Sequence, residues 1–361
     1  MRKLYQLSTL NNQNGVTAVV IAILIVFFLG LVALAIDIGY NMVVRNELQN
    51  VSDAAALAAV RQLGEICETP CPLSDEQADA IKKAAIHIAK QNQAGGKPTN
   101  IHESDILIGQ WHPDSAELIE TLCRPNAVMV RARRDDTAAG SPNGPITTFF
   151  GRILGIPTMN LRKDATAALG GICIARPAIP VGISRHWFEK PEYCNQRIKL
   201  HPTNDPESCA GWNTYDEKPA NAETLRKILT GLTEQSIKIP EPVAGKDRFQ
   251  FIGGDVASDF DHMAALFNAM KGLDDNKLDF DNDPNTWTTY VPVYEWADCS
   301  NPRGDLLIVG FAMVTITSVV PPPDKIIWAT VVCDTLCDNS SPERAACNDF
   351  GIRSRIPHLV Q

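Results

Sequence analysis

The chain has 361 residues, of which 45% are apolar and 21% are charged, and its formal net charge is −9. This size and composition favour one or two packed domains. The acidic balance and the lack of a Lys/Arg cluster argue against a nucleic-acid partner, because phosphate binding needs a basic surface.

Residues 16–36 form the most apolar segment, VTAVVIAILIVFFLGLVALAI, which contains no charged residue. About 21 residues are enough for a helix to cross the ~30 Å hydrocarbon core of a bilayer. The segment therefore predicts a transmembrane helix that tethers a globular body. Its predicted membrane residues include Val16, Phe27, Phe28 and Ile36.

The flanks of this segment predict its orientation. Arg2 and Lys3 precede it without any acidic residue, so residues 1–15 should stay in the cytoplasm and the body should cross the membrane. A cut after Ala35, in an A-x-A site, would instead release the body, although the ~17 apolar residues before it exceed the 7–15 of a signal peptide. Prepilin-type cleavage after Gly15 is the other alternative, but Val20 stands where such sites usually carry Glu.

Residues 37–64 continue the apolar segment with helical periodicity. Because no proline occurs before Pro70, both segments are predicted to form one helix of roughly 48 residues, about 70 Å long. A break near Asp53 is the alternative, because Ser52 and Asp53 are suitable N-caps. The apolar stripe either packs on the protein's own body or docks partner membrane helices, and its residues are Tyr40, Val44, Leu48, Val51, Ala55 and Ala58.

The next hundred residues predict an α+β domain over 37–170. Ser74 and Gln77 form a capping box that begins a second helix, and Gly95-Gly96 ends it. The pattern then predicts strands at 105–111 and 127–133 joined by a polar connection, a short helix at 146–154, and a strand at 159–169.

Residues 171–361 are predicted to be a second, Cys-rich α+β domain with antiparallel strands. The change of composition near 171–180 marks the boundary. In chain order the pattern predicts a helix capped by Asn221 and ending near 232, a helix at 259–273, a strand at 286–294, and a hairpin of 306–320 with 325–333, followed by a loop at 337–361.

All ten cysteines follow the apolar segment. A translocated domain meets oxidising conditions, which favours disulfides, and the spacings lack the paired C-x₂-C motifs of a zinc site. The connectivity cannot be deduced from spacing. Cys194 with Cys209 is the single pair we favour, because one polar, Pro-rich loop holds both. The other candidates are Cys67, Cys71, Cys333 and Cys337.

An acidic cluster with Asp279, Asp281 and Asp283 is the best metal candidate, because oxygen ligands at alternate positions suit calcium. Pro284 and Tyr290 occupy the sixth and twelfth positions, which excludes an EF-hand. A solvated acidic turn is the alternative.

Catalytic and sugar-binding groups are also weighed against structural roles. Asp255, Asp259, Asp261 and His262 could serve a hydrolase, but Asp259 could simply cap the helix that follows. The tryptophans of the second domain are either core residues or a sugar-binding platform, namely Trp187, Trp212, Trp287, Trp296 and Trp328.

Several motifs are shared with a known family. They are Asn14-Gly15 before the apolar segment, Asp37-Ile38-Gly39 at its end, Leu48-Gln49-Asn50 followed by residues 53–58, Phe149-Phe150-Gly151-Arg152 with Leu154-Gly155-Ile156, and the strand at 165–168. The chain resembles the TadG-like and TadE-like proteins of Flp (Tad) pilus assembly over residues 10–65, and more loosely to about 170.

The resemblance implies a structural, non-enzymatic component of the bacterial inner membrane with its body in the periplasm and no cofactor. Its partners would be other pilus assembly proteins or pilins, together with membrane lipid. Larger relatives carry a von Willebrand A domain with an Asp-x-Ser-x-Ser metal site, which residues 338–342 do not reproduce. The alternative is a tethered adhesion or ligand-binding module in which residues 171–361 bind calcium or a glycan.

Overall fold

A computed structural model describes residues 13–66, 71–113, 115–138, 144–189, 193–202, 208–253, 256–272, 283–335 and 347–361. The architecture is α+β, as predicted. The chain divides into two compact units, and each is described by itself. The first comprises Met1–Ala55, Ala85–Ile106 and Val130–Ala165, and the second comprises Ala56–Ala84, Leu107–Met129 and Thr166–Gln361.

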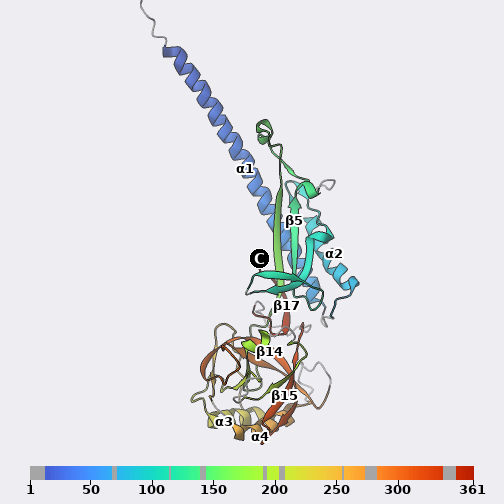
Figure 1. Cartoon of the computed structure of the whole chain (residues 1–361), viewed down its shortest axis with the longest axis vertical. Helices are drawn as coiled ribbons and strands as arrows, with labels where there is room; N and C mark the ends of the chain where they lie inside the picture. The colour runs from blue at the N-terminus through green and yellow to red at the C-terminus, as the bar shows by residue number, and fades with distance from the viewer. Residues whose placement is uncertain are drawn as a thin grey trace, which may run out of the picture. The chain divides into compact units, whose positions relative to one another are not determined.

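Helix α1 (Gln13–Gly64) is a single helix of 52 residues (Figure 1). At 1.5 Å per residue it is about 78 Å long. Ser52 caps no new helix: its Oγ lies 2.9 Å from each of the carbonyl oxygens of Leu48 and Lys163, and its one hydroxyl proton is directed at these acceptors. The prediction of one continuous helix is therefore confirmed, and the alternative break near Asp53 is wrong.

Helix α2 (Asp75–Gln91) begins at the predicted capping box. The Ser74 amide donates to Gln77 Oε1 at 3.0 Å, and the Gln77 amide donates to Ser74 Oγ at 3.2 Å. A small hairpin follows, formed by β1 (Gln93–Ala94) and β2 (Lys97–Pro98). Its turn residues Gly95 and Gly96 have φ of 63° and 71°, a backbone conformation that glycine adopts without steric cost.

A six-stranded sheet has the order β16-β17-β8-β5-β3-β4. The predicted strands at 105–111, 127–133 and 159–169 are confirmed within two residues at each end, apart from a break at Asn160. The expected polar connection also contains a strand, β4, which pairs antiparallel with β3. The bounds are β3 (Ile106–His112), β4 (Glu117–Glu120), β5 (Ala127–Arg134), β8 (Leu161–Gly171), β16 (Asp334–Thr335) and β17 (Ile352–Leu359).

The C-terminal tail corrects the sequence prediction. Residues 337–361 were expected to be a loop, but β17 pairs antiparallel with β8. Its sequence IRSRIPHL has little apolar alternation, so the local pattern gave no strand signal. The strand forms because its backbone pairs with the N–H and C=O groups that β8 would otherwise leave unpaired at the sheet edge, and β8 lies about 190 residues earlier in the chain.

The segment predicted as a helix at 146–154 is mostly not helical. Strands β6 (Ile146–Thr147) and β7 (Thr158–Met159) pair antiparallel, and they enclose one 3₁₀ turn, η3 (Gly151–Leu154). Gly155, with φ of 83°, ends this turn. We call residues 146–159 the clamp loop.

The second unit contains a seven-stranded sheet of order β10-β15-β14-β13-β9-β11, with β12 paired to β14. The predicted β14–β15 hairpin is antiparallel and confirmed. The bounds are β9 (Val181–Ser184), β10 (Arg197–Leu200), β11 (Ala210–Trp212), β12 (Arg248–Phe251), β13 (Trp287–Tyr294), β14 (Gly304–Val320) and β15 (Ile326–Val332).

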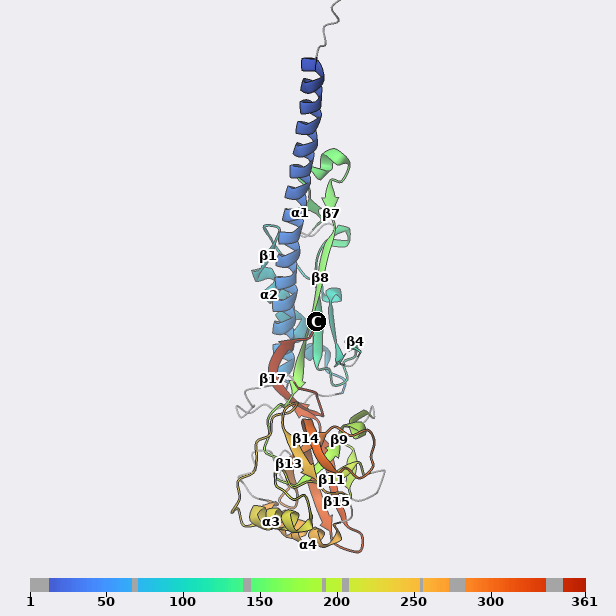
Figure 2. The ribbon, with the colours of Figure 1, turned by 90° about the vertical axis from the view of Figure 1, so that its left-hand side faces the viewer.

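Two predicted helices lie side by side at one end of this sheet, α3 (Ala222–Thr233) and α4 (Phe260–Met270) (Figures 1 and 2). Asn221 caps α3 as predicted, since its Oδ1 accepts from the Thr224 amide at 3.0 Å. The core between helices and sheet includes the fully buried Trp212, Phe260 and Phe311. Single 3₁₀ turns complete the elements: η1 (Glu103–Asp105), η2 (Asp136–Ala138), η4 (Arg185–Glu189) and η5 (Ala257–Asp259).

Disulfides form in the second unit, but not with the pairing that we favoured. Cys194 bonds Cys333 and Cys209 bonds Cys299, so the predicted pair Cys194–Cys209 is wrong. Strand β10 pairs with β15 with Arg197 opposite Thr330, and continuing this register three residues places Cys194 opposite Cys333. The other two bridges are Cys71–Cys123 and Cys173–Cys347, while Cys67 and Cys337 lie outside the described residues.

The bridges Cys173–Cys347, Cys194–Cys333 and Cys209–Cys299 are nested, each enclosing the next in sequence. Sheet register, rather than closeness in sequence, decides which cysteines meet. Each of the three bridges links the N-terminal part of the segment 173–347 to its C-terminal part.

Candidate functional site

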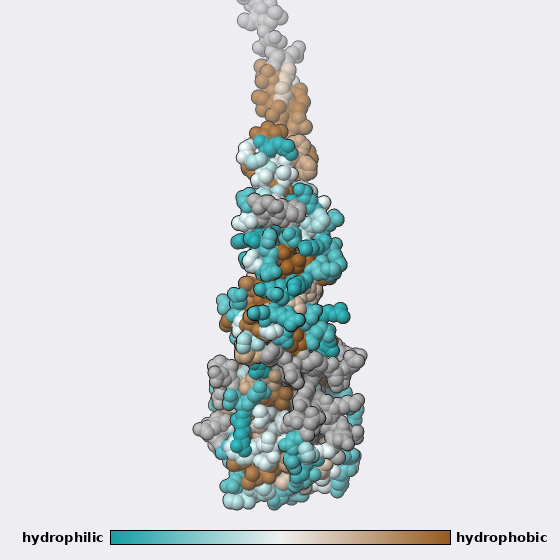
Figure 3. All heavy atoms as spheres, turned by 90° about the vertical axis from the view of Figure 1, so that its right-hand side faces the viewer, coloured by the Kyte–Doolittle hydropathy of each residue, from teal (hydrophilic) through white to brown (hydrophobic). Residues whose placement is uncertain are grey.

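The N-terminal part of α1 presents uncovered apolar side chains. Among the described residues, α1 is the one helix that is long and apolar enough to span a membrane, and none of its most apolar window is buried. The predicted membrane residues Val16, Phe27, Phe28 and Ile36 are 45–68% exposed. Figure 3 shows this part of the helix as predominantly apolar. An apolar surface of this extent is typical of a segment that meets lipid or another apolar partner.

Asp37, the first residue after the apolar segment, holds the clamp loop. Its carboxylate accepts the backbone N–H groups of Phe149 at 2.7 Å, Phe150 at 3.0 Å and Gly151 at 2.6 Å. The side chain is only 8% exposed. Three backbone donors on one carboxylate fix the loop to the helix at the point where the apolar segment ends.

The charge of Asp37 is matched to these donors. Burial by itself raises the pKa of the carboxyl, but the three N–H donors and the Arg152 guanidinium outweigh it, so the pKa lies below its usual value. The carboxylate is therefore ionised at neutral pH and accepts all three bonds. The sequence marked Asp37 and Phe149–Gly151 only as separate family motifs, and their contact was not foreseen.

Two side-chain contacts continue the attachment along the next turn of α1. The rings of Tyr40 and Phe149 meet edge to face, with centroids 5.3 Å apart. Asn41 Nδ2 lies 3.0 Å from Met159 Sδ in the last strand of the clamp loop. The loop is thus attached to α1 at its turn, through Phe149, and at its second strand, through Met159.

A second attachment lies two turns further along the helix. Glu47 accepts the Gly95 amide at 2.7 Å. The buried Arg134 donates to the Gly144 carbonyl at 2.9 Å, and burial lowers the pKa of its guanidinium. A Cβ on Gly95 would lie 3.0 Å from Arg134 Nη1 and 3.2 Å from Ile146 Cδ1, so this glycine allows the hairpin, β5 and the clamp loop to converge.

The predicted interaction stripe of α1 is mostly covered by the chain itself. Val44, Leu48, Val51 and Ala55 are at most 1% exposed, and Tyr40 and Ala58 are half-buried. This burial favours intramolecular packing of the stripe, and its role as a docking face stays a prediction. The exposed apolar residues on this part of α1 are Ile38, Met42 and Val43.

The predicted calcium cluster lies largely outside the described residues, which include Asp283 but neither Asp279 nor Asp281. Asp283 Oδ1 accepts the backbone amide and the side-chain amide of Asn285 at 2.9 and 3.0 Å. This geometry is that of an Asx turn, which favours the solvated-turn interpretation. In the ranges that the structure describes, no group of three or more His, Cys, Asp or Glu is placed to hold a metal.

Asp259 has a structural partner rather than the role predicted for it. It makes no capping bond to α4, and its Oδ1 instead lies 3.2 Å from Arg226 Nε on α3. The side chain is fully buried, and burial raises its pKa against the opposing effect of Arg226. The pair ties α3 to α4, and Asp255 lies outside the described residues.

Three of the five tryptophans considered for a sugar platform are buried. Trp187, Trp212 and Trp287 are at most 5% exposed and belong to the core. The Trp328 ring faces the Arg197 guanidinium at 3.9 Å. The platform is therefore wrong for the three buried residues, because the sheet needs them as core.

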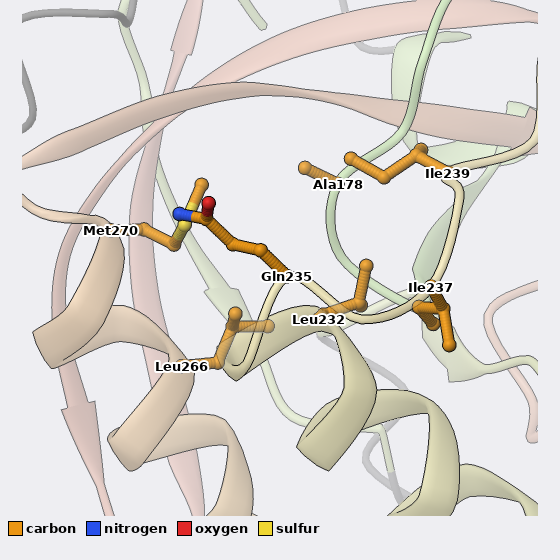
Figure 4. A pocket seen from close by; sticks show the side chains of 7 residues that line it. All are labelled: Ala178, Leu232, Gln235, Ile237, Ile239, Leu266 and Met270. Carbon is orange, nitrogen blue, oxygen red and sulfur yellow. The ribbon is translucent and has the colours of Figure 1, made fainter.

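A small cavity lies beside α3 and α4 (Figure 4). Its volume is about 190 Å³, whereas ligand pockets usually enclose roughly 300–1,000 Å³. Gln235 is its one polar lining residue, so it offers little to orient a ligand. The lining residues are Ala178, Leu232, Gln235, Ile237, Ile239, Leu266 and Met270.

Two family models match the part of the chain that carries the clamp. Residues 15–62 match Tad, the Flp pilus-assembly TadE/G-like family, and residues 54–167 match Tad_C, the Tad-like Flp pilus-assembly family. Together the two matches cover residues 15–167, so this part of the chain is similar to the Tad families of Flp pilus assembly. The resemblance predicted from sequence is thereby confirmed, and the family supports a role in pilus assembly. No characterised protein and no solved structure matches the chain.

The Tad match contains α1 from Gly15 onward together with Asp37 and the whole clamp loop. Residues 168–361, with the nested disulfides, lie outside it. The candidate functional site is therefore the exposed part of α1 and the clamp loop that Asp37 attaches to it.

Proposed function

We propose that this Tad-family chain is a membrane-anchored structural component of a Flp (Tad) pilus or related type IV-like secretion machine, acting through protein–protein contacts. The observation that carries the proposal is the uncovered apolar part of α1, which continues without a break into a helix packed in the body. One rigid helix can thus couple a membrane span to the folded domain.

The proposed location is the bacterial inner membrane, with the N-terminus in the cytoplasm and the body in the periplasm. Arg2 and Lys3 before the span support this orientation. The four disulfides support an oxidising compartment for the body.

The proposed role is structural rather than enzymatic. Two of the carboxylates considered for catalysis or calcium have structural partners, namely Arg226 for Asp259 and Asn285 for Asp283. The Tad family supports the same conclusion. The expected partners are other pilus assembly proteins or pilins, and the net charge of −9 gives no support for a nucleic acid.

Site-specific photo-cross-linking in membranes that contain the pilus machine tests this function. A photoreactive residue at Met42, which is 62% exposed just beyond the span, should give adducts with other pilus components. The same group at Lys97, in the exposed β1–β2 hairpin, is the matched control. Adducts that are absent at both positions would contradict protein–protein action near the span, and alkaline extraction of the chain from membranes would contradict anchoring.

A further inference from the structure

The clamp loop carries apolar side chains that the body leaves uncovered. Phe149, Phe150, Ile153, Leu154 and Ile156 are 39–78% exposed. In the part of the chain that the structure describes, ten large apolar side chains outside α1 are exposed. Five of these ten lie within the eight consecutive residues 149–156. Such a concentration, unlike scattered single residues, indicates a contact surface.

The depth of the loop follows from its attachment to Asp37. The 21 residues 16–36 span about 31 Å along a helix, which matches the hydrocarbon core of a bilayer. Asp37 therefore lies at the boundary of the membrane on the side of the body, and the three N–H bonds place the loop backbone there. In Figures 1 and 2 the turn of the loop extends from β7 toward the N-terminal end of α1.

We propose that the turn of the clamp loop, residues 149–156, is a second membrane contact that enters the interfacial layer of the bilayer spanned by α1. The occupant of this apolar surface is lipid. The inference rests on the proposed membrane anchoring of α1 and adds a second point of attachment, which restricts rotation and tilt of the helix.

The backbone of the turn is prepared for an environment without water. A backbone N–H that enters lipid unpaired costs several kcal/mol. At least seven of the nine N–H groups of residues 148–156 donate within the protein, three of them to Asp37 and four to carbonyls of Phe150, Gly151, Arg152 and Pro157. The Thr148 hydroxyl also donates to the Ile156 carbonyl at 2.6 Å.

The charges of residues 146–163 are compatible with contact to the surface of a bilayer. Residues 146–163 contain no acidic residue, and the one charge inside the turn is Arg152, whose guanidinium donates to the Thr148 carbonyl. A cation at this depth suits anionic headgroups. Exposed aromatic and aliphatic side chains beside one arginine are typical of interfacial segments.

Fluorescence quenching in vesicles tests the proposal with the full chain. Leu154→Cys is labelled with an environment-sensitive fluorophore under non-reducing conditions, and the label taken up by the wild type is subtracted. The protein is reconstituted at high lipid-to-protein ratio in phosphatidylcholine and phosphatidylglycerol vesicles that contain nitroxide lipids. Lys97→Cys, exposed on the β1–β2 hairpin, is the aqueous control, and Leu29→Cys, inside the span, is the lipid control.

We expect nitroxide lipids to quench Leu154→Cys roughly fivefold more than Lys97→Cys, and aqueous iodide to quench it correspondingly less. Equal quenching of Leu154→Cys and Lys97→Cys, with Leu29→Cys quenched by nitroxide lipids, would contradict the membrane contact of the loop. It would not contradict the membrane anchoring of α1. If Leu29→Cys also escapes lipid quenching, the anchor fails as well. If neither nitroxide lipids nor aqueous iodide quench the label at Leu154→Cys, the turn is covered by protein, and lipid is not what contacts it.

Asp37→Ala in the Leu154→Cys chain tests the positioning. Loss of the three acceptor bonds should lower the lipid quenching of the label toward the Lys97→Cys value, while Leu29→Cys in the same background stays quenched. Unchanged quenching at Leu154→Cys would overturn the inference that Asp37 sets the depth of the loop.

Discussion

The bridge Cys194–Cys333 should stabilise the second unit by an amount that its nesting determines. Its cysteines are 139 residues apart. In the unfolded chain Cys173–Cys347 stays closed, so the shortest loop through the bridge runs from 173 to 194 and from 333 to 347, about 35 residues. The chain-entropy relation gives about 4 kcal/mol at 25 °C for such a loop, against about 5 kcal/mol for a loop of 139 residues.

The double variant Cys194→Ser with Cys333→Ser measures this contribution. Its unfolding free energy is obtained in detergent from non-reducing urea titrations, followed by the fluorescence of the buried tryptophans. A loss near 4 kcal/mol is expected. A loss below about 1 kcal/mol would refute the nested-loop reasoning, because no closed loop of this length has so small an entropy in the relation used.

Thiol mapping separates the observed pairing from pairing within one loop. Cys194→Ser with Cys333→Ser should leave no new alkylatable cysteine, whereas Cys194→Ser with Cys209→Ser should expose Cys299 and Cys333. Peptide mass spectrometry after alkylation distinguishes the two results. New thiols at Cys209 and Cys299 in the first variant, with none in the second, would contradict the pairing described here.

Further predictions concern packing, capping and pH. Leu48→Ala should cost about 2–5 kcal/mol in urea unfolding because the side chain is fully buried, whereas the exposed Met42→Ala should stay within about 0.5 kcal/mol; equal losses would contradict the packed stripe. Asn221→Ala should cost about 1 kcal/mol through loss of the α3 cap, and an unchanged midpoint would contradict that role. The pKa of Asp259 is higher in the folded than in the unfolded protein, so the folded protein binds this proton more tightly. The unfolding free energy should therefore fall as pH rises from the ordinary aspartate pKa through the raised pKa of Asp259. Asp259→Asn should remove this fall in the unfolding free energy, and equal pH profiles for both proteins would contradict it.

The confirmed predictions rest on sequence patterns within a few consecutive residues. The uncharged segment 16–36 and the spacing of Val44, Leu48 and Val51 depend on neighbours within one or two helical turns, and α1 has the predicted continuity. The Ser74 capping box and the Asn221 cap likewise need only a few consecutive residues. Each is an interaction whose partners the chain brings together by its own local geometry.

Contacts between distant residues were beyond such reasoning. Asp37 and Phe149 are 112 positions apart, and nothing local to the segment 146–154 shows that a carboxylate from another element holds its amides, so it was predicted as a helix. The exposed apolar residues of the clamp loop indicate a contact surface only once this contact places them at the end of the apolar segment of α1.

The sequence by itself therefore determined the long apolar helix, three strands of each of the two large sheets, and the similarity of residues 15–167 to the Tad families. The tertiary structure decided the attachment of the clamp loop to Asp37, the disulfide pairing and the strand β17. Helical periodicity and capping are properties of short stretches, whereas carboxylate–amide contacts, sheet register and edge pairing arise only when distant parts of the chain close on one another.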